Sequence, residues 1–152
     1  MRTEKSTREY WKPGNMLYPV PAVMVSCCRS GERPNIITVA WAGTVCSEPP
    51  MLSISVRKER YSYDIIRESG EFAVNLVNRD LVRAADYCGV KSGRDVDKFG
   101  EMELTPMQSQ RIAAPGIAES PVCLECRVVK QLPLGSHDLF LAEILTVSVD
   151  GQ

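Results

Sequence analysis

Short strand-like runs follow one another closely along this chain, and their spacing limits the folds that it can adopt. Four such runs, rich in β-branched and apolar residues, are AVMVSCC at 22–28, IITVAWA at 36–42, LSISV at 52–56 and FAVNLV at 72–77. Parallel neighbouring strands need a crossover of about a dozen residues or more, and most of these connections are too short for one. The sequence therefore predicts a mainly antiparallel barrel or a strongly curved sheet.

Two longer runs complete the expected sheet, and two short helices interrupt it. The strands are VCLECRVVKQL at 122–132 and DLFLAEILTVSV at 138–149, which PLGSH joins in a hairpin-like turn. In 60–70 the apolar period becomes that of a helix, with Gly70 as its C-terminal cap, and 81–88 is expected to form a second helix. The polar stretch 91–100 predicts a structured loop, and 103–121 predicts a long surface connection.

Length, composition and charge narrow the class of protein. The 152 residues, with 44% hydrophobic and 24% charged, predict a single globular domain over 1–152. A formal net charge of −1 argues against a nucleic-acid partner, which favours a strongly basic protein. The start MRTEKSTREYWKPG is charged where a secretory signal is apolar, and no apolar run approaches the ~18 residues of a membrane-spanning helix. We therefore expect a cytoplasmic protein without a membrane partner.

The six cysteines are expected to be thiols, because a chain of this length and apolar content needs no disulfide staples. Cys123 and Cys126 form a CxxC, but strand alternation places Cys126 on one face and Cys123 on the other. A CxxC on a strand, in a chain with one histidine, favours a structural role over a metal site. We expect no bound metal.

The stretch from 35 to 62 gathers small and polar residues around one tryptophan. Its hydroxyl groups belong to Thr38, Thr44, Ser53, Ser55 and Ser62. Gly43 lets a ligand approach the backbone, and Trp41 offers a flat apolar face. Because the two strands in this stretch are expected to be neighbours, their polar groups predict a pocket for a planar ligand with polar edges.

A basic cluster follows directly. VRKERYS places Arg57, Lys58 and Arg60 at the end of a strand and the start of a helix. Helix N-terminal amides attract anions, and arginine matches the geometry of phosphate oxygens. A phosphate site is one interpretation. The other is a solvated basic turn flanked by Glu59 and Asp64, which charge alone favours.

Several blocks, in their order, resemble one protein family. NIITVAWAGTVCSEPP, LSISVRKERYSYDII and GEFAVNLV resemble the flavin reductase-like family of FMN-binding split barrels, specifically its flavoredoxin-like branch. DYCGVKSGRDVDKF and LGSHDLFLAEIL are similar to further blocks, so the resemblance runs from about Pro19 to Val149. It implies an antiparallel Greek-key split β-barrel with short flanking helices, FMN as cofactor, and a homodimer with flavin sites at or near the interface. Such chains usually continue for some tens of residues, so the usual C-terminal tail is expected to be missing.

The same resemblance assigns roles to particular residues. Those implied along the isoalloxazine ring are Thr38, Trp41, Ala42, Gly43 and Thr44. Those implied at the phosphate and ribityl chain are Ser55, Arg57, Arg60 and Ser62. Lys98 resembles a family lysine near the flavin, where a cation would stabilise negative charge on the reduced ring. The alternative is a surface lysine paired with Asp95 or Asp97.

The turn Gly135-Ser136-His137 resembles the GDH motif that flavin reductases associate with the nicotinamide nucleotide, with serine in place of aspartate. A lone histidine is more often structural, yet this resemblance makes His137 a candidate catalytic residue beside Lys98. The expected function is an FMN-dependent oxidoreductase that transfers a hydride or electrons through FMN N5, with NADH or NADPH as co-substrate. One alternative is an FMN-binding electron carrier without its own NAD(P)H site, which docks with a redox partner protein. A third is a structural barrel without its cofactor.

Overall fold

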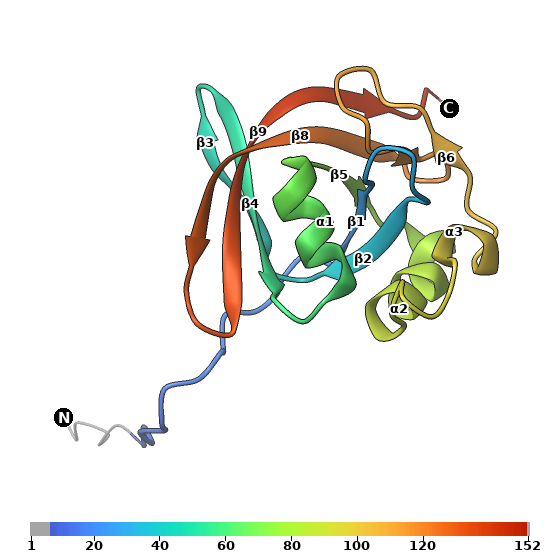
Figure 1. Ribbon diagram of the computed structural model, residues 1–152. Coiled ribbons are helices and arrows are strands. Elements are labelled where there is room, and N and C mark those ends of the chain that lie inside the picture. The colour runs from blue at the N-terminus through green and yellow to red at the C-terminus, as the bar shows by residue number, and fades with distance from the viewer. Residues whose placement is uncertain (1–6, 152) are drawn as a thin grey trace.

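The computed structural model describes residues 7–151 and contains a seven-stranded antiparallel sheet that curls into a split barrel (Figure 1). The order of its strands is β2-β1-β5-β8-β9-β4-β3. These strands are β1 (Val23–Cys27), β2 (Asn35–Val39), β3 (Ala42–Ser47), β4 (Pro50–Arg57), β5 (Glu71–Leu76), β8 (Val122–Pro133) and β9 (His137–Val149). The predicted mainly β, antiparallel split-barrel fold is confirmed.

Short helices and one small ribbon complete the fold. The helices are α1 (Tyr61–Ser69), η1 (Arg79–Leu81), α2 (Val82–Val90) and α3 (Lys98–Glu101), and the ribbon pairs β6 (Pro106–Met107) with β7 (Gly116–Ile117). The predicted loop at 91–100 therefore ends in the first residues of α3. Within residues 7–151, no helix is both long enough and apolar enough to cross a membrane.

The two longest strands, β8 and β9, join the halves of the barrel. β8 pairs with β5 and β9 pairs with β4, while the two strands pair with each other from Val122↔Val149 to Pro133↔Asp138. Bulges interrupt their register, and bulges bend strands, which lets a long hairpin follow a curved barrel wall. The interior is filled by large apolar side chains that are almost fully buried, among them Phe72, Phe140, Ile54 and Ile66.

The serines and apolar residues of β4 alternate as the sequence predicted. Leu52, Ile54 and Val56 are buried in the barrel, whereas Ser53 and Ser55 lie on the other face and are half-buried. The same alternation separates the CxxC cysteines: Cys126 packs in the barrel core, and Cys123 packs in a cluster under the 103–121 segment. All six cysteines are free thiols.

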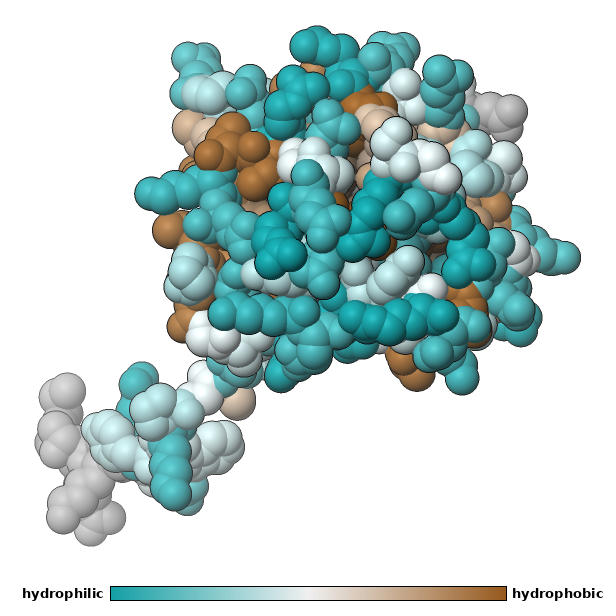
Figure 2. All heavy atoms as spheres, in the orientation of Figure 1, coloured by the Kyte–Doolittle hydropathy of each residue, from teal (hydrophilic) through white to brown (hydrophobic). Residues whose placement is uncertain are grey.

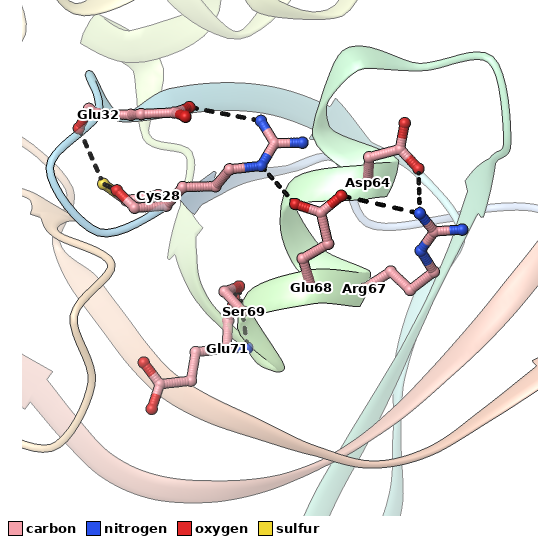
Figure 3. Close-up of polar contacts among 8 residues, drawn as sticks. Cys28, Glu32, Asp64, Arg67, Glu68, Ser69 and Glu71 are labelled. Atoms are coloured by element: carbon pink, nitrogen blue, oxygen red, sulfur yellow. Dashed lines mark hydrogen bonds and ion pairs between the residues drawn. The ribbon is translucent and has the colours of Figure 1, made fainter.

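Helix α1 lies against the barrel and ends as predicted. Gly70 takes the left-handed conformation, with φ 68°, and its amide bonds Ile66 O. An ion pair ties the helix to the β1–β2 turn, since Arg29 contacts Glu68 at 2.6 Å. Arg29 also contacts Glu32 within the turn, at 3.5 Å. Figure 3 shows Arg67 beside Glu68 in the same network. These contacts fix the helix whose first turn faces the basic cluster.

A second apolar cluster lies on the other side of β1 and β2. Helices α2 and α3 pack there, with Met24, Ile36, Cys88 and Phe99 among the buried side chains. The 103–121 segment was predicted to be a surface connection, but it buries Ile117 and is held by the chain around it. Since the carboxylate of Glu125 accepts hydrogen bonds from two of its backbone amides, at 2.9 and 2.7 Å, this segment is anchored rather than loosely laid over the surface.

The run IITVAWA was predicted as one strand, and this prediction is wrong at its end. β2 stops at Val39, and β3 begins at Ala42, with Trp41 in the bend between them. β2 and β3 are the two edges of the sheet order, so the chain must turn here to pass from one edge to the other. The Trp41 carbonyl accepts a hydrogen bond from the Ser55 amide at 2.9 Å, which fixes the bend against β4.

An N-terminal arm, residues 7–20, leads away from the barrel (Figure 1). It has no regular secondary structure, and its large side chains Tyr10, Trp11 and Leu17 are 94%, 75% and 88% exposed. Figure 2 shows that hydrophobic side chains on the visible face gather on the side where β3 lies, whereas much of the remaining surface is hydrophilic.

Candidate functional site

Three adjoining cavities form a trough across the seam between β2, β3 and β4. The basic cavity, of about 350 Å³, shares Ile37, Arg57 and Arg60 with a middle cavity of about 180 Å³. The middle cavity shares Ala40, Trp41 and Ser55 with an apolar cavity of about 700 Å³. The trough therefore runs continuously from the first turn of α1 to the root of the N-terminal arm.

The basic cavity concentrates positive charge in a chain whose net charge is −1. Its cationic lining residues are Arg57, Arg60, Lys91, Arg94 and Lys98. Glu59 is the carboxylate among the lining residues and lies 3.5 Å from the Arg57 guanidinium. A local field of this kind attracts anions even when the whole protein is nearly neutral.

The first turn of α1 opens into this basic cavity. The helix has nine residues, its cap residue Arg60 provides no side-chain cap, and Tyr61 and Ser62 line the cavity. Within residues 7–151, neither the Tyr61 amide nor the Ser62 amide has an acceptor. Unpaired amides at a helix N-terminus, beside arginine side chains, suit a phosphate group.

The loop from Lys91 to Arg94 forms the opposite wall of the basic cavity. Arg94 donates to the Glu59 carbonyl at 3.2 Å, and its guanidinium lies 5.4 Å from the centroid of the Tyr61 ring. Gly93 packs so closely on this helix end that an added Cβ would overlap the Asn35 amide and the Tyr61 ring. The loop is thus docked against α1, and glycine is required at the contact.

Lys98 lies beneath the basic cavity and is only 3% exposed. Its ammonium donates to the carbonyls of Ile36, at 2.6 Å, and Cys88, at 2.8 Å. Burial lowers the pKa of Lys98 to about 8, and the Arg60 charge acts in the same direction. The alternative of a surface lysine paired with Asp95 or Asp97 is therefore wrong.

Trp41 and His137 meet at the middle cavity. Their ring centroids are 4.6 Å apart, and the planes are inclined by 39°. The Ser136 hydroxyl lies 2.8 Å from His137 Nδ1, within hydrogen-bond distance. Burial, followed by the nearby Arg57 charge, lowers the pKa of His137 below its usual value. Both effects favour the neutral imidazole.

The apolar cavity lies between the arm and the start of β3. Met16, Leu17 and Tyr18 of the arm line it, opposite Trp41 and Gly43. No charged side chain is among its lining residues in the described chain. A Cβ added to Gly43 would meet no atom within 4 Å, so the backbone there is open to a ligand. This end of the trough suits an uncharged ring.

Most of the residues predicted for the site line the trough. These are Trp41, Ala42, Gly43, Ser55, Arg57, Arg60, Ser62, Lys98 and His137. Thr38 borders the middle cavity, but its hydroxyl donates to the Ala85 carbonyl of α2. The Ser62 hydroxyl is also engaged, since it accepts a hydrogen bond from the Asn35 side chain at 2.8 Å. Thr44 is exposed and lies outside these three cavities of the described structure.

Sequence reasoning missed the second wall of the basic cavity. Lys91 and Arg94 belong to this wall, and Asn35 of β2 lines the same cavity, although none of the three was singled out as a site residue. The available signal was a glycine between basic residues in the stretch KSGR, which already belonged to a block of the family resemblance. Nothing in the sequence of the arm indicated that its residues line the apolar cavity.

Comparisons with known proteins agree with this geometry. The sequence model described as "Flavin reductase like domain" matches residues 15–152. Flavoredoxin of Desulfovibrio vulgaris (Miyazaki F) is 36% identical, with a TM-score of 0.86 over 95% of this chain and 78% of that chain. Flavoredoxin from Methanosarcina acetivorans is 33% identical, with a TM-score of 0.84 over 95% of this chain and 77% of that chain. An uncharacterized protein of Archaeoglobus fulgidus is 35% identical over 133 residues, or 87% of this chain and 73% of its own length.

Proposed function

The chain belongs to the flavin reductase-like family, and from that premise we propose that it is an FMN-binding oxidoreductase of the flavin reductase or flavoredoxin type. The observation that carries the proposal is the change from charged to uncharged lining side chains along the trough. One end is cationic and includes free helix amides, whereas the other end is lined without charged side chains. FMN likewise has a charged end and an uncharged end, because a polyol chain joins its phosphate to an uncharged ring.

The residues present fit FMN at both ends. At the basic end, Arg57 and Arg60 would bind the phosphate together with the amides of Tyr61 and Ser62. At the other end, the 42% exposed Trp41 offers a flat apolar surface, and Gly43 leaves the backbone open. Ser55 borders both the middle and the apolar cavities, so its hydroxyl is placed to bond the polyol or the ring edge.

Bound FMN would supply hydride and electron transfer at N5, so the reaction would not need a nucleophile or an acid–base triad from the protein. The protein itself would bind FMN, orient its ring and set the electrostatic field around it. Lys98 borders the basic cavity, so its charge adds to the field that holds the phosphate, and its expected role beside the reduced ring stays a prediction. His137 lies against Trp41 and both line the middle cavity, so the two rings border the passage between the ends of the trough.

The second reactant decides between two versions of this function. In the favoured version, NADH or NADPH delivers a hydride, and His137 in the turn that resembles GDH contacts the nicotinamide nucleotide. In the alternative, the protein is an FMN-binding electron carrier that docks with a redox partner protein. Serine at position 136 favours the alternative, because it removes the carboxylate of the family motif.

We also propose that the protein works as a homodimer. The support is the arm, whose Tyr10 and Trp11 are highly exposed although such side chains gain free energy when buried. A second copy would cover this surface and the open side of the apolar cavity. Light scattering tests the proposal: a dimer that becomes monomeric when residues 1–13 are removed supports it, and a monomeric full chain contradicts it.

Absorbance spectroscopy tests the main proposal. The purified protein is loaded with FMN, separated from free FMN, and mixed anaerobically with NADH and then NADPH. A bound flavin spectrum that bleaches rapidly supports the oxidoreductase. A bound spectrum that does not bleach, except when a reductase is added, supports the carrier. Absence of any bound flavin contradicts both versions.

A further inference from the structure

Asp138 is a buried carboxylate for which the flavin proposal gives no role. It is 2% exposed and directly follows His137, which faces the trough. The Tyr63 hydroxyl donates to Asp138 Oδ2 at 2.6 Å, and the Gln131 amide donates to the same oxygen at 2.7 Å. The Lys58 ammonium lies 3.6 Å from Oδ1, an atom without a hydrogen bond in the described chain.

The partners of this carboxylate come from separate elements. Tyr63 belongs to α1, Gln131 to β8 and Asp138 to β9, while Lys58 follows the end of β4. Gln131 also donates to the Tyr63 hydroxyl at 2.9 Å, which closes a three-membered cluster. An ionised carboxylate is costly to bury without such partners, so each partner constrains where β9 can lie. The hydroxyl of Tyr63 lowers the pKa of Asp138, which keeps the carboxylate ionised.

Strand geometry links the cluster to His137. Successive side chains of a strand point to opposite faces, so an inward Asp138 requires an outward His137. The pairing of β4 with β9 places Arg57 opposite His137 and Val56 opposite Asp138. The turn that precedes His137, residues 134–136, is exposed. Its backbone is held to the hairpin by the bond from the Leu134 amide to the His137 carbonyl, at 3.1 Å.

We propose that Asp138 is a positioning residue: with Tyr63 and Gln131 it anchors the start of β9 so that the His137 ring stays against the Trp41 ring at the middle of the trough. The anchor also joins α1, which carries the proposed phosphate site, to the hairpin that carries His137. Any role of His137 toward bound FMN rests on the proposed function, whereas the anchoring of the start of β9 does not depend on FMN.

Proton NMR of the protein without flavin tests the anchor, because His137 is the only histidine. Stacking on an indole displaces the imidazole proton resonances upfield, and a Trp41→Leu variant gives their unstacked positions. We expect Asp138→Asn and Tyr63→Phe to move the resonances most of the way toward the Trp41→Leu positions. Tyr63→Phe keeps the ring that packs on Phe140 and therefore serves if Asp138→Asn does not fold.

Two controls separate anchoring from general loss of stability or charge. Val74→Ala removes core volume on β5, opposite Leu124 and away from the turn that precedes His137, and Asp64→Asn removes a partly exposed carboxylate from α1. Both should leave the imidazole resonances in place. Folded Asp138→Asn and Tyr63→Phe proteins that keep the wild-type resonances would overturn the proposal. FMN titration of the wild type runs in parallel, so a failure to bind FMN contradicts the proposed function without deciding the question of the anchor.

Discussion

The rings of Trp41 and His137 contact each other at a tilt, with centroids 4.6 Å apart, although 96 positions separate them in the sequence. Trp41 stands in the bend where the chain passes between the two edges of the sheet, and His137 begins β9. The pair therefore sits at the seam of the split barrel, between the basic and the apolar cavities. Whatever occupies the trough must pass beside these rings.

The ionisation of His137 gives a first prediction. Its pKa should lie below the ordinary value of about 6.5, because burial and the Arg57 charge disfavour the imidazolium. The unfolded chain then binds more protons than the folded chain as the pH falls through the ordinary value, so this histidine makes the fold less stable in acid. NMR titration of the single imidazole measures the pKa, and Arg57→Ala should raise it. A folded-state pKa above that of the unfolded chain would contradict the prediction.

Removing two arginines should weaken FMN binding while leaving the fold intact. We expect Arg57→Ala combined with Arg60→Ala to cost about 2 to 5 kcal/mol of FMN binding free energy, because charged hydrogen bonds contribute about 1.5 to 3 kcal/mol each. Both residues border the basic and middle cavities. Fluorescence titration with FMN measures the loss.

Riboflavin and a distant arginine supply the controls for this double variant. Riboflavin lacks the phosphate, so its affinity should change little. Arg67→Ala removes a guanidinium at the far end of α1, where it pairs with Asp64, and should leave FMN affinity unchanged. An equal loss for FMN and riboflavin would remove the phosphate assignment.

Local patterns predicted the antiparallel sheet, its faces and the place of the basic cluster, whereas the split barrel and the phosphate interpretation came from the family resemblance. Alternation in β4 revealed its buried and half-buried faces, and Gly70 marked the end of α1. The cluster at Arg57 and Arg60 is contiguous with a helix start, which is a local signal. Each of these features depends on neighbours only a few residues away.

Other parts of the site depend on contacts between distant segments. The Thr38 hydroxyl was expected to face a pocket, but α2 provides the Ala85 carbonyl as its acceptor. Lys98 looks like a surface residue in a polar stretch, yet packing of α3 against β2 buries it under Ile36. Arg94 enters the site because Gly93 permits close docking on α1. None of these placements can be read from periodicity.

Gly93→Ala should displace the second wall of the basic cavity. The added methyl group would overlap Asn35 and Tyr61, so the loop or the start of α1 must move. We expect a stability loss of about 1 to 3 kcal/mol, as for overpacking in general, together with weaker FMN binding. Urea unfolding and FMN titration measure the two effects. Gly151→Ala is the matched control, since nothing lies within 4 Å of its added Cβ. Unchanged FMN affinity in a Gly93→Ala protein would show that the loop is not part of the site.

Lys98 should leave a signature in the alkaline stability of the protein. Its folded pKa of about 8 lies below the ordinary value of about 10.4, chiefly because of burial. Between these values the unfolded chain binds a proton that the folded chain does not, so Lys98 makes stability rise with pH. Cysteine and tyrosine residues also titrate there, so the informative quantity is the difference between the wild type and Lys98→Met.

Urea unfolding from pH 7 to pH 10.5 measures that difference. Relative to the wild type, Lys98→Met should lose stability as the pH rises, because it lacks the favourable contribution of a deprotonating lysine. Lys130→Met, at an exposed position of β8, should follow the wild type. Parallel curves for the wild type and Lys98→Met would contradict the lowered pKa.

Ser136→Asp tests whether the altered turn separates an electron carrier from a reductase. The Ser136 hydroxyl lies 2.8 Å from His137 Nδ1, so a carboxylate at this position would stand beside the imidazole and raise its pKa. If the serine limits the reaction with nicotinamide nucleotides, FMN-loaded Ser136→Asp should bleach faster with NADH or NADPH than the wild type. Stopped-flow absorbance measures that rate, and NMR titration of His137 confirms that the new carboxylate acts on the ring.

Ser136→Asn is the neutral control, because it has nearly the same shape without the charge. A raised His137 pKa with no change in the bleaching rate would show that the charge at position 136 does not govern the reaction.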